Sequence, residues 1–148
     1  AFAGVKNKLE FQARETERFC RRHDIGTFKM NPFFPVNTLL LMRCAVAAQL
    51  DGVLETYVGA AYHYMWEEPR KMDDPAVVRD ALVSAGLDGD RLLARAQDGD
   101  VKAALMQSTQ SAVERGAFGA PTFFVGDEMF FGKDQLRDVE EAIVAAKM

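Results

Sequence analysis

Thiols are scarce in this chain of 148 residues, which holds Cys20 and Cys44 and no C-x-x-C pair. Two cysteines so far apart in sequence encode no redox dithiol, and a structural zinc site lacks ligands. We therefore expect no metal. Because free cysteines are most often interior, we expect both thiols to be mostly buried.

Neither sign of charge is in large excess, with 18 basic and 22 acidic residues. The net charge of −4 is spread along the sequence, so no basic patch argues for nucleic acid or for an anionic membrane as a partner. The longest apolar runs, residues 37–50 and 53–66, are interrupted by polar side chains and are too short to span a bilayer. The sequence thus predicts a soluble, cytoplasmic protein without a transmembrane or signal segment.

What the sequence does contain is helical periodicity over most of its length. Pro32 and Pro35 exclude a helix from residues 27–35, which should form an extended loop. Asn37 or Thr38 should cap the helix that follows, and this helix is apolar all round, which argues for burial. The six helices predicted before the C-terminal region cover residues 5–23, 37–50, 53–66, 75–85, 88–97 and 100–115.

Helix ends carry the expected signals. Asp74 followed by Pro75 is a good N-cap and first-turn pair, and Asp88 and Asp100 open the next two helices. The first helix should end at Ile25-Gly26, with an apolar stripe of Leu9, Ala13, Phe19 and Cys20 on one face.

The most informative stretch, residues 115–134, reads R-G-A-F-G-A-P-T-F-F-V-G-D-E-M-F-F-G-K-D. A Gly-X-Pro bend enters a strand over Thr122–Val125, a Gly-Asp turn reverses it, and a second strand ends at Gly132. Lys133 and Asp134 then open a last helix over residues 135–146. This pattern predicts the C-terminal half of a thioredoxin-like sheet.

A two-stranded hairpin is marginal in water because it cannot cover both of its faces. The strand Thr122–Val125 is apolar throughout, as strands buried on both sides are. We therefore expect partner strands that precede Ala1 in a longer product or come from another chain.

Three motifs in order carry a resemblance over essentially the whole chain: A-F-A-G-V-K-N-K-L, F-K-M-N-P-F-F-P-V-N-T-L-L-L-M-R and G-A-F-G-A-P-T-F-F-V-G-D-E-M-F-F-G-K-D-Q-L. With them the chain resembles the 2-hydroxychromene-2-carboxylate isomerase family, which is related to kappa-class glutathione transferases in the DsbA-like branch of thioredoxin folds. The resemblance implies an α/β thioredoxin-like fold with a large helical insertion. Residues 1–116 would be the mainly helical insertion and residues 117–148 the C-terminal β-hairpin and helix, without the N-terminal strand-helix-strand.

The same resemblance implies a glutathione-dependent isomerase whose cofactor thiolate adds reversibly to a small aromatic carboxylic acid. The serine that activates the thiol in the family would lie upstream, so this chain holds no catalytic residue and should be inactive alone. Phe33 stands where the family motif has His. The oligomeric state stays open, a homodimer included.

Glutathione contacts follow from the resemblance. Pro121 would be cis, leaving the Ala120 N–H and C=O to pair with the cysteinyl backbone of glutathione. Phe131 and Gly132 lead into the turn where Lys133 and Asp134 would meet the γ-glutamyl group. Asp134 can also cap the last helix.

Two further contacts are implied nearer the start of the chain. Lys8 would lie near the glutathione or substrate anion, although a solvated helix charge is the ordinary fate of a lysine. Asn37 would contact ligand, although it is first of all a helix cap.

Other readings stay open. The chain could belong to a DsbA-like thiol-disulfide oxidoreductase with an upstream C-x-x-C, or serve as a non-catalytic helical interaction module. Some aromatic residues could wall a substrate pocket, although aromatics at helical spacing are more often core. These are Phe33, Phe34, Tyr57, Tyr62, Tyr64 and Trp66. His23 and His63 have no partner at a recognisable spacing and are expected to be ordinary surface or core residues.

Overall fold

The computed structural model describes residues 5–147, which fall into two compact units, one up to Val101 and one from Lys102. The first unit contains α1 (Lys8–Arg22), α2 (Leu39–Leu50), α3 (Leu54–Trp66), α4 (Pro75–Ser84) and α5 (Gly89–Arg95). After α6 (Gly99–Glu114), the second unit contains β1 (Thr122–Val125), β2 (Glu128–Phe131), a 3₁₀ turn η1 (Lys133–Gln135) and α7 (Leu136–Ala145). Among these helices none has the length and apolar character needed to cross a bilayer. The predicted division at residue 116 into insertion and thioredoxin-like part stays a prediction.

The core of the first unit lies among α2 to α5. Helix α2 packs on α3 and α5, and α4 contacts both α3 and α5. The side chains at its centre are fully buried: Cys44, Met72, Val78, Leu82, Leu92 and Val101. Gly89 permits the close approach of α4 and α5, because a Cβ there would lie 2.6 Å from the Arg79 carbonyl oxygen.

The predicted helix caps are confirmed at three positions. The Asp74 carboxylate accepts from the Ala76 N–H at 3.0 Å, and Asp88 accepts from the Arg91 N–H at 2.9 Å. Asn37 Oδ1 accepts from the N–H of Leu39, the first residue of α2, at 3.1 Å. Each side chain satisfies an N–H that has no partner inside its helix.

The prediction for α1 was wrong at its start and correct to within one residue at its end. The helix begins at Lys8 because Asn7 has a left-handed backbone with φ 66°. It ends at Arg22, before Ile25-Gly26, because Asp24 takes the left-handed conformation with φ 54°. The predicted apolar stripe exists, but no α1 residue is buried, and Leu9 is 63% exposed.

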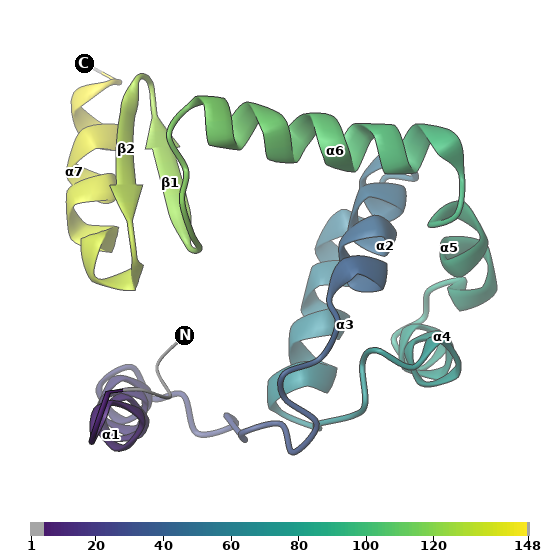
Figure 1. Cartoon of the computed structure of the whole chain (residues 1–148), viewed down its shortest axis with the longest axis horizontal. Helices are drawn as coiled ribbons and strands as arrows, with labels where there is room; N and C mark the ends of the chain where they lie inside the picture. Colours follow the sequence, from purple (N-terminus) through teal and green to yellow (C-terminus); the bar gives the residue numbers. More distant parts are fainter. Residues whose placement is uncertain (1–4, 148) are drawn as a thin grey trace. The chain divides into compact units, whose positions relative to one another are not determined.

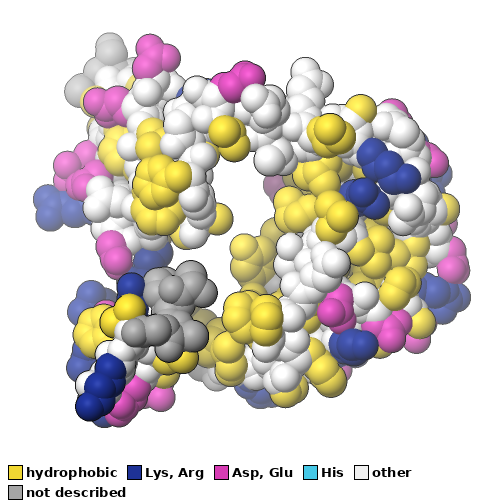
Figure 2. Space-filling model, viewed as in Figure 1, with side chains coloured by type: hydrophobic (Ala, Val, Ile, Leu, Met, Phe, Trp, Pro, Cys, Tyr) yellow, Lys and Arg dark blue, Asp and Glu magenta, His cyan; other side chains and the backbone are white. Residues whose placement is uncertain are grey.

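Two expectations of burial also need correction. Helix α2 buries only one side, and Leu39, Met42 and Leu50 are about half exposed. Cys44 is fully buried as expected, whereas Cys20 on α1 is only half-buried. Hydrophobic side chains accordingly reach the surface over α2 and α3 (Figure 2). An apolar sequence pattern does not say how much of a helix its neighbours cover.

The second unit is organised around the β1–β2 hairpin. The strands are antiparallel, with Phe124 opposite Met129 and Thr122 opposite Phe131. Gly126 at the turn has φ 58°, the pattern of a type II′ hairpin with Gly at its first central position. Side chains of directly opposed residues share a face, so these four lie on one face of the hairpin.

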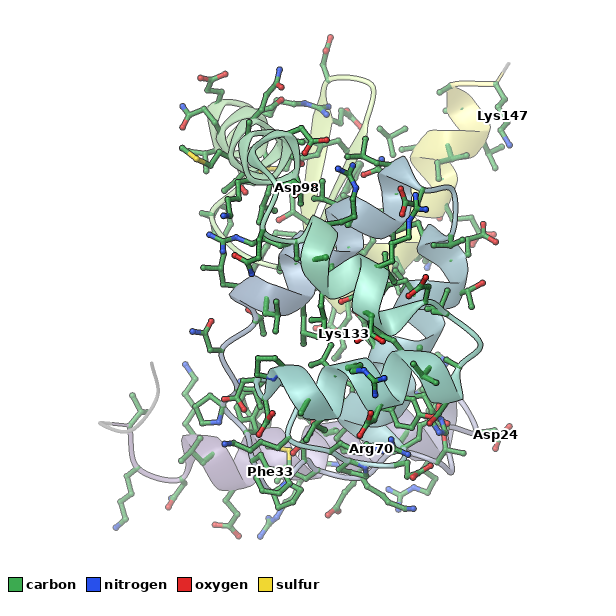
Figure 3. All side chains as sticks on the ribbon, turned by 90° about the vertical axis from the view of Figure 1, so that its right-hand side faces the viewer. Asp24, Phe33, Arg70, Asp98, Lys133 and Lys147 are labelled. Atoms are coloured by element: carbon green, nitrogen blue, oxygen red, sulfur yellow. The ribbon has the colours of Figure 1, made fainter. Side chains whose placement is uncertain are left out.

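The segment between α6 and β1 runs back along the hairpin (Figure 1). From the end of α6 it travels away from the turn, and β1 then returns toward the turn. Helix α7 follows η1 and contacts β1. Lys133 lies in η1, before α7, and Lys147 follows α7 (both are labelled in Figure 3). The predicted last helix over residues 135–146 is thus confirmed with its first turn tightened into η1.

Candidate functional site

The sequence analysis implied ligand contacts for eight residues. Six of them, Ala120, Pro121 and residues 131–134, meet at one end of the hairpin. The Gly132 N–H donates to the Pro121 carbonyl at 2.9 Å, which joins the entry of β1 to the exit of β2. Ala120 and Pro121 therefore lie beside the turn that carries Lys133 and Asp134. In Figure 1 this is the end of the hairpin opposite the β1–β2 turn.

One edge of β1 is free for another backbone. Its other edge pairs with β2, and within residues 5–147 the sheet holds only these two strands. Ala120 stands two residues before the first residue of β1, and the Ala120–Pro121 peptide bond is cis, as predicted. A peptide that added to this edge would extend the sheet from the position of Ala120.

The Lys133–Asp134 turn presents both signs of charge side by side. Lys133 Nζ donates to Asp134 Oδ1, and the two side chains are 44% and 82% exposed. Gly132, which introduces the turn, has φ 96°, a backbone conformation that L side chains rarely adopt. The suggestion that Asp134 caps the last helix is wrong: within the described residues its carboxylate bonds to Lys133 and to no backbone N–H, because η1 precedes α7.

The ring of Phe131 packs against the segment that precedes Ala120. The rings of Phe118 and Phe131 lie 4.6 Å apart between centroids. A Cβ on Gly119 would come within 2.9 Å of the Phe131 ring, so only glycine fits there without a shift. The Thr122 hydroxyl donates to the Gly119 carbonyl at 2.6 Å. These contacts hold the segment before Ala120 against the face of the hairpin.

Lys8 and Asn37 belong to the first unit. Lys8 is the first residue of α1 and is half-buried. Asn37 caps α2, and its N–H donates to Asp73 Oδ2 at 3.5 Å. The capping role expected for Asn37 is confirmed, while a ligand contact for either residue stays a prediction.

The aromatic residues considered for a pocket divide into core and surface. Tyr57 and Tyr64 are buried in the core of the first unit, whereas Tyr62 is 66% exposed. Trp66 gathers two rings from the loop before α2, those of Phe28 at 5.8 Å and Phe34 at 5.9 Å between centroids. This loop cluster therefore presents aromatic surface at one end of the first unit.

Asn31 fixes that loop and was missed at the level of sequence. Its side chain is 2% exposed, with Nδ2 donating to the Arg70 carbonyl at 2.9 Å and Oδ1 accepting from the Phe33 N–H at 2.9 Å. Phe33 and Arg70 lie at the same end of the first unit (Figure 3). The signal was present in N-P-F-F-P, since Asn before Pro favours a turn held by its own side chain.

Two titratable side chains, those of Cys44 and Tyr57, are buried in the core of the first unit. Burial raises the pKa of the Cys44 thiol to about 11, so this thiol stays protonated and unreactive. Burial also raises the pKa of Tyr57, whose hydroxyl donates to the Leu41 carbonyl at 2.7 Å. His63 lies between Glu67 and Glu68 at the end of α3. No cluster of His, Cys, Asp and Glu suited to a metal occurs among residues 5–147.

The comparison with known families settles the fold. A model of the DSBA-like thioredoxin domain matches residues 5–144. The chain belongs to this family. The hairpin and α7 are therefore the C-terminal part of a DsbA-like thioredoxin fold, here mostly helical with a small two-stranded sheet.

Curated relatives of this DSBA-like chain carry one name. It is 32% identical over 103 residues to the 2-hydroxychromene-2-carboxylate isomerase of Sphingobium xenophagum, which covers 68% of this chain and 51% of the relative. Over 40 residues it is 48% identical to the enzyme of the same name from Pseudomonas sp. (strain C18), covering 27% of this chain and 19% of the relative. The chain thus spans about half the length of the Sphingobium relative.

A solved structure agrees with this assignment. The selenomethionine form of 2-hydroxychromene-2-carboxylate isomerase superposes with a TM-score of 0.83, over 99% of this chain and 70% of that one, at 22% identity. At 22% identity this structural match is evidence for the fold alone. The resemblance inferred from the three sequence motifs is confirmed, with residues 1–4 of the first motif outside the described residues.

Proposed function

We propose that this DSBA-like chain contributes the tripeptide-binding part of a glutathione-dependent isomerase of the 2-hydroxychromene-2-carboxylate type. The observation that carries the proposal is the hydrogen bond from Gly132 to Pro121, which puts an open strand edge next to a turn bearing both a cation and an anion. The curated relatives named as this isomerase support the reaction class.

The charges of the turn match one end of glutathione. The γ-glutamyl group carries an ammonium and a carboxylate on the same carbon. Asp134 can accept from the ammonium, and Lys133 can donate to the carboxylate, because both side chains are reachable from solvent. Exchanging their mutual ion pair for these two contacts leaves neither charge without a partner.

The open edge matches the middle of the tripeptide. Ala120 precedes β1, and within residues 5–147 no strand pairs with its N–H and C=O, so the cysteinyl residue can add there as a short strand. A ligand with an extended backbone and a zwitterionic end would therefore meet both features of this site. A small aromatic carboxylic acid is the substrate class that the relatives' name suggests.

When bound, glutathione would supply a thiolate nucleophile for reversible addition to the substrate. The residues of this chain would hold and orient the peptide, and the serine expected upstream from the family resemblance would activate the thiol. A peptide bound in this way has lost translational and rotational freedom, so its thiolate would react with a bound substrate as in a unimolecular step. The chain alone should therefore bind the tripeptide without turning over substrate.

Isothermal titration calorimetry of the chain with S-methylglutathione tests the proposal without involving thiol chemistry. The dipeptide S-methyl-Cys-Gly, which lacks the zwitterionic γ-glutamyl group, should bind much more weakly. Asp134→Asn and Lys133→Met should each weaken S-methylglutathione binding roughly five- to tenfold, as loss of a charge-assisted hydrogen bond does.

Asp138→Asn is the matched control, because Asp138 is an exposed carboxylate on α7 in the same unit. It should leave the dissociation constant unchanged. Equal binding of the tripeptide and the dipeptide, or equal effects of the Asp134 and Asp138 substitutions, would remove the support for the site.

A further inference from the structure

We infer that Arg115 is a positioning residue that fixes the Ala120–Pro121 segment from the opposite end of the hairpin. The inference deepens the proposed function, because that segment is the part of the site offered to the tripeptide backbone. It rests on contacts that Arg115 makes within the second unit.

Arg115 follows directly after α6 and reaches the hairpin turn. Its Nη2 donates to the Gly126 carbonyl at 2.9 Å. Its guanidinium carbon also lies 3.8 Å from the centroid of the Phe124 ring. A planar guanidinium can stack and donate at the same time, which a lysine ammonium cannot do.

These two contacts close a loop. The chain leaves Arg115, runs along the hairpin through residues 116–119 to Ala120, and returns through β1 to Gly126 (Figure 1). The Arg115 side chain joins the two ends of this path at Gly126. Ala120 and Pro121 are the part of the loop farthest along the chain from this closure.

The path is also held along its length. A Cβ on Gly116 would lie 3.8 Å from the sulfur of Met129, and Phe118 lies against Phe131. Met129 and Phe131 share a face with Phe124, so Arg115 and the segment after it cover that face together. Phe118 is nevertheless 72% exposed, so its ring contact alone does not fix the segment.

The physical consequence is preorganisation. If Arg115 restricts the segment to the conformation that accepts a ligand backbone, its loss lowers the fraction of competent molecules. The apparent dissociation constant then rises in inverse proportion to that fraction. Arg115 touches neither the open edge of β1 nor the Lys133–Asp134 pair, so its effect would pass through the backbone of the segment.

The test compares Arg115→Met with Arg137→Met. Arg137 lies on α7 with its side chain 84% exposed, so the control makes the same change of charge in the same unit. In Arg115→Met, ¹⁵N order parameters of residues 116–120 should fall, while those of β1, β2 and the first unit stay at the wild-type level. The dissociation constant for S-methylglutathione should rise about fivefold, as a fall of the competent fraction to about a fifth requires. Arg115→Lys, which keeps the charge and a donor, should lie between.

Unchanged order parameters in Arg115→Met would overturn the inference. So would a loss of order throughout β1 and β2, because Arg115 would then support the hairpin generally. Wild-type protein that binds no S-methylglutathione would refute the proposed function instead, and the order parameters would still decide the role of Arg115.

Discussion

A single polar side chain, that of Asn31, holds the conformation of the loop before α2. Asn31 is the only buried polar residue among those the structure describes, and it bonds to two backbone groups. Because Phe33 lies in the loop before α2 and Arg70 in the loop between α3 and α4, no helix or strand would satisfy these groups if the side chain were removed. Together with the bond from the Lys29 N–H to the Trp66 carbonyl, Asn31 ties the loop that carries Phe28 and Phe34 to the end of α3.

Replacing Asn31 with Ala should destabilise the first unit by about 1–3 kcal/mol, since the Arg70 carbonyl and the Phe33 N–H lose their partner inside the protein. Trp66 is the single tryptophan of the chain, so its fluorescence during urea denaturation reports this unit. Gln49→Ala, which removes an exposed amide from α2, should stay within about 0.5 kcal/mol of wild type. A similar value for both variants would show that the Asn31 bonds do not hold the loop.

At the scale of elements, two glycines differ in the space around them: one lies where helices pack closely, and the other lies in open space. Gly89 lies where α4 and α5 approach, and an added Cβ would collide with backbone at Arg79. Gly59 lies in α3 with nothing within 4 Å of such a Cβ. The two positions therefore make a matched pair for the same substitution.

Gly89→Ala should lower the melting temperature followed by circular dichroism, because backbone must move to admit the methyl group. Gly59→Ala should raise the unfolding free energy by about 0.5–1 kcal/mol, the helix propensity difference between the two residues. Stabilisation by Gly89→Ala would mean that α4 and α5 are farther apart than described.

The elements could be predicted from sequence where their signals are local. Asp74-Pro75, Asp88 and the Gly126-Asp127 turn act within a few residues, and each works as predicted. The exposure of α1 could not be predicted. An apolar stripe with Leu9 does not say whether another element covers it.

The same limit applies to the candidate site. Ala120, Gly132 and the Lys133–Asp134 turn were found because they follow one another along a recognisable motif. Arg115 and Asn31 were not found, since their partners Gly126 and Arg70 are 11 and 39 residues away. A contact with a distant carbonyl leaves no pattern in the sequence, whereas the local bond from the Phe33 N–H to Asn31 was signalled by N-P-F-F-P.

For the whole molecule, the two units have different chemistry. The first has a closed core of packed helices, with its one fully buried thiol kept inert by burial. The second has a small sheet with an open edge and an exposed pair of opposite charges. Its exposed hydrophobic side chains include Phe118, in the segment before β1, and Phe131 at the end of β2. The proposed function places peptide binding in the second unit and depends on that assignment.

The most direct measurement is a titration of the ¹⁵N-labelled chain with reduced glutathione, followed by amide chemical shifts. The account predicts that the amides of Ala120, Gly132, Lys133 and Asp134 shift together along one binding curve while those of α2 to α5 stay in place. Shifts confined to the first unit, or none at the end of the hairpin at millimolar ligand, would contradict it.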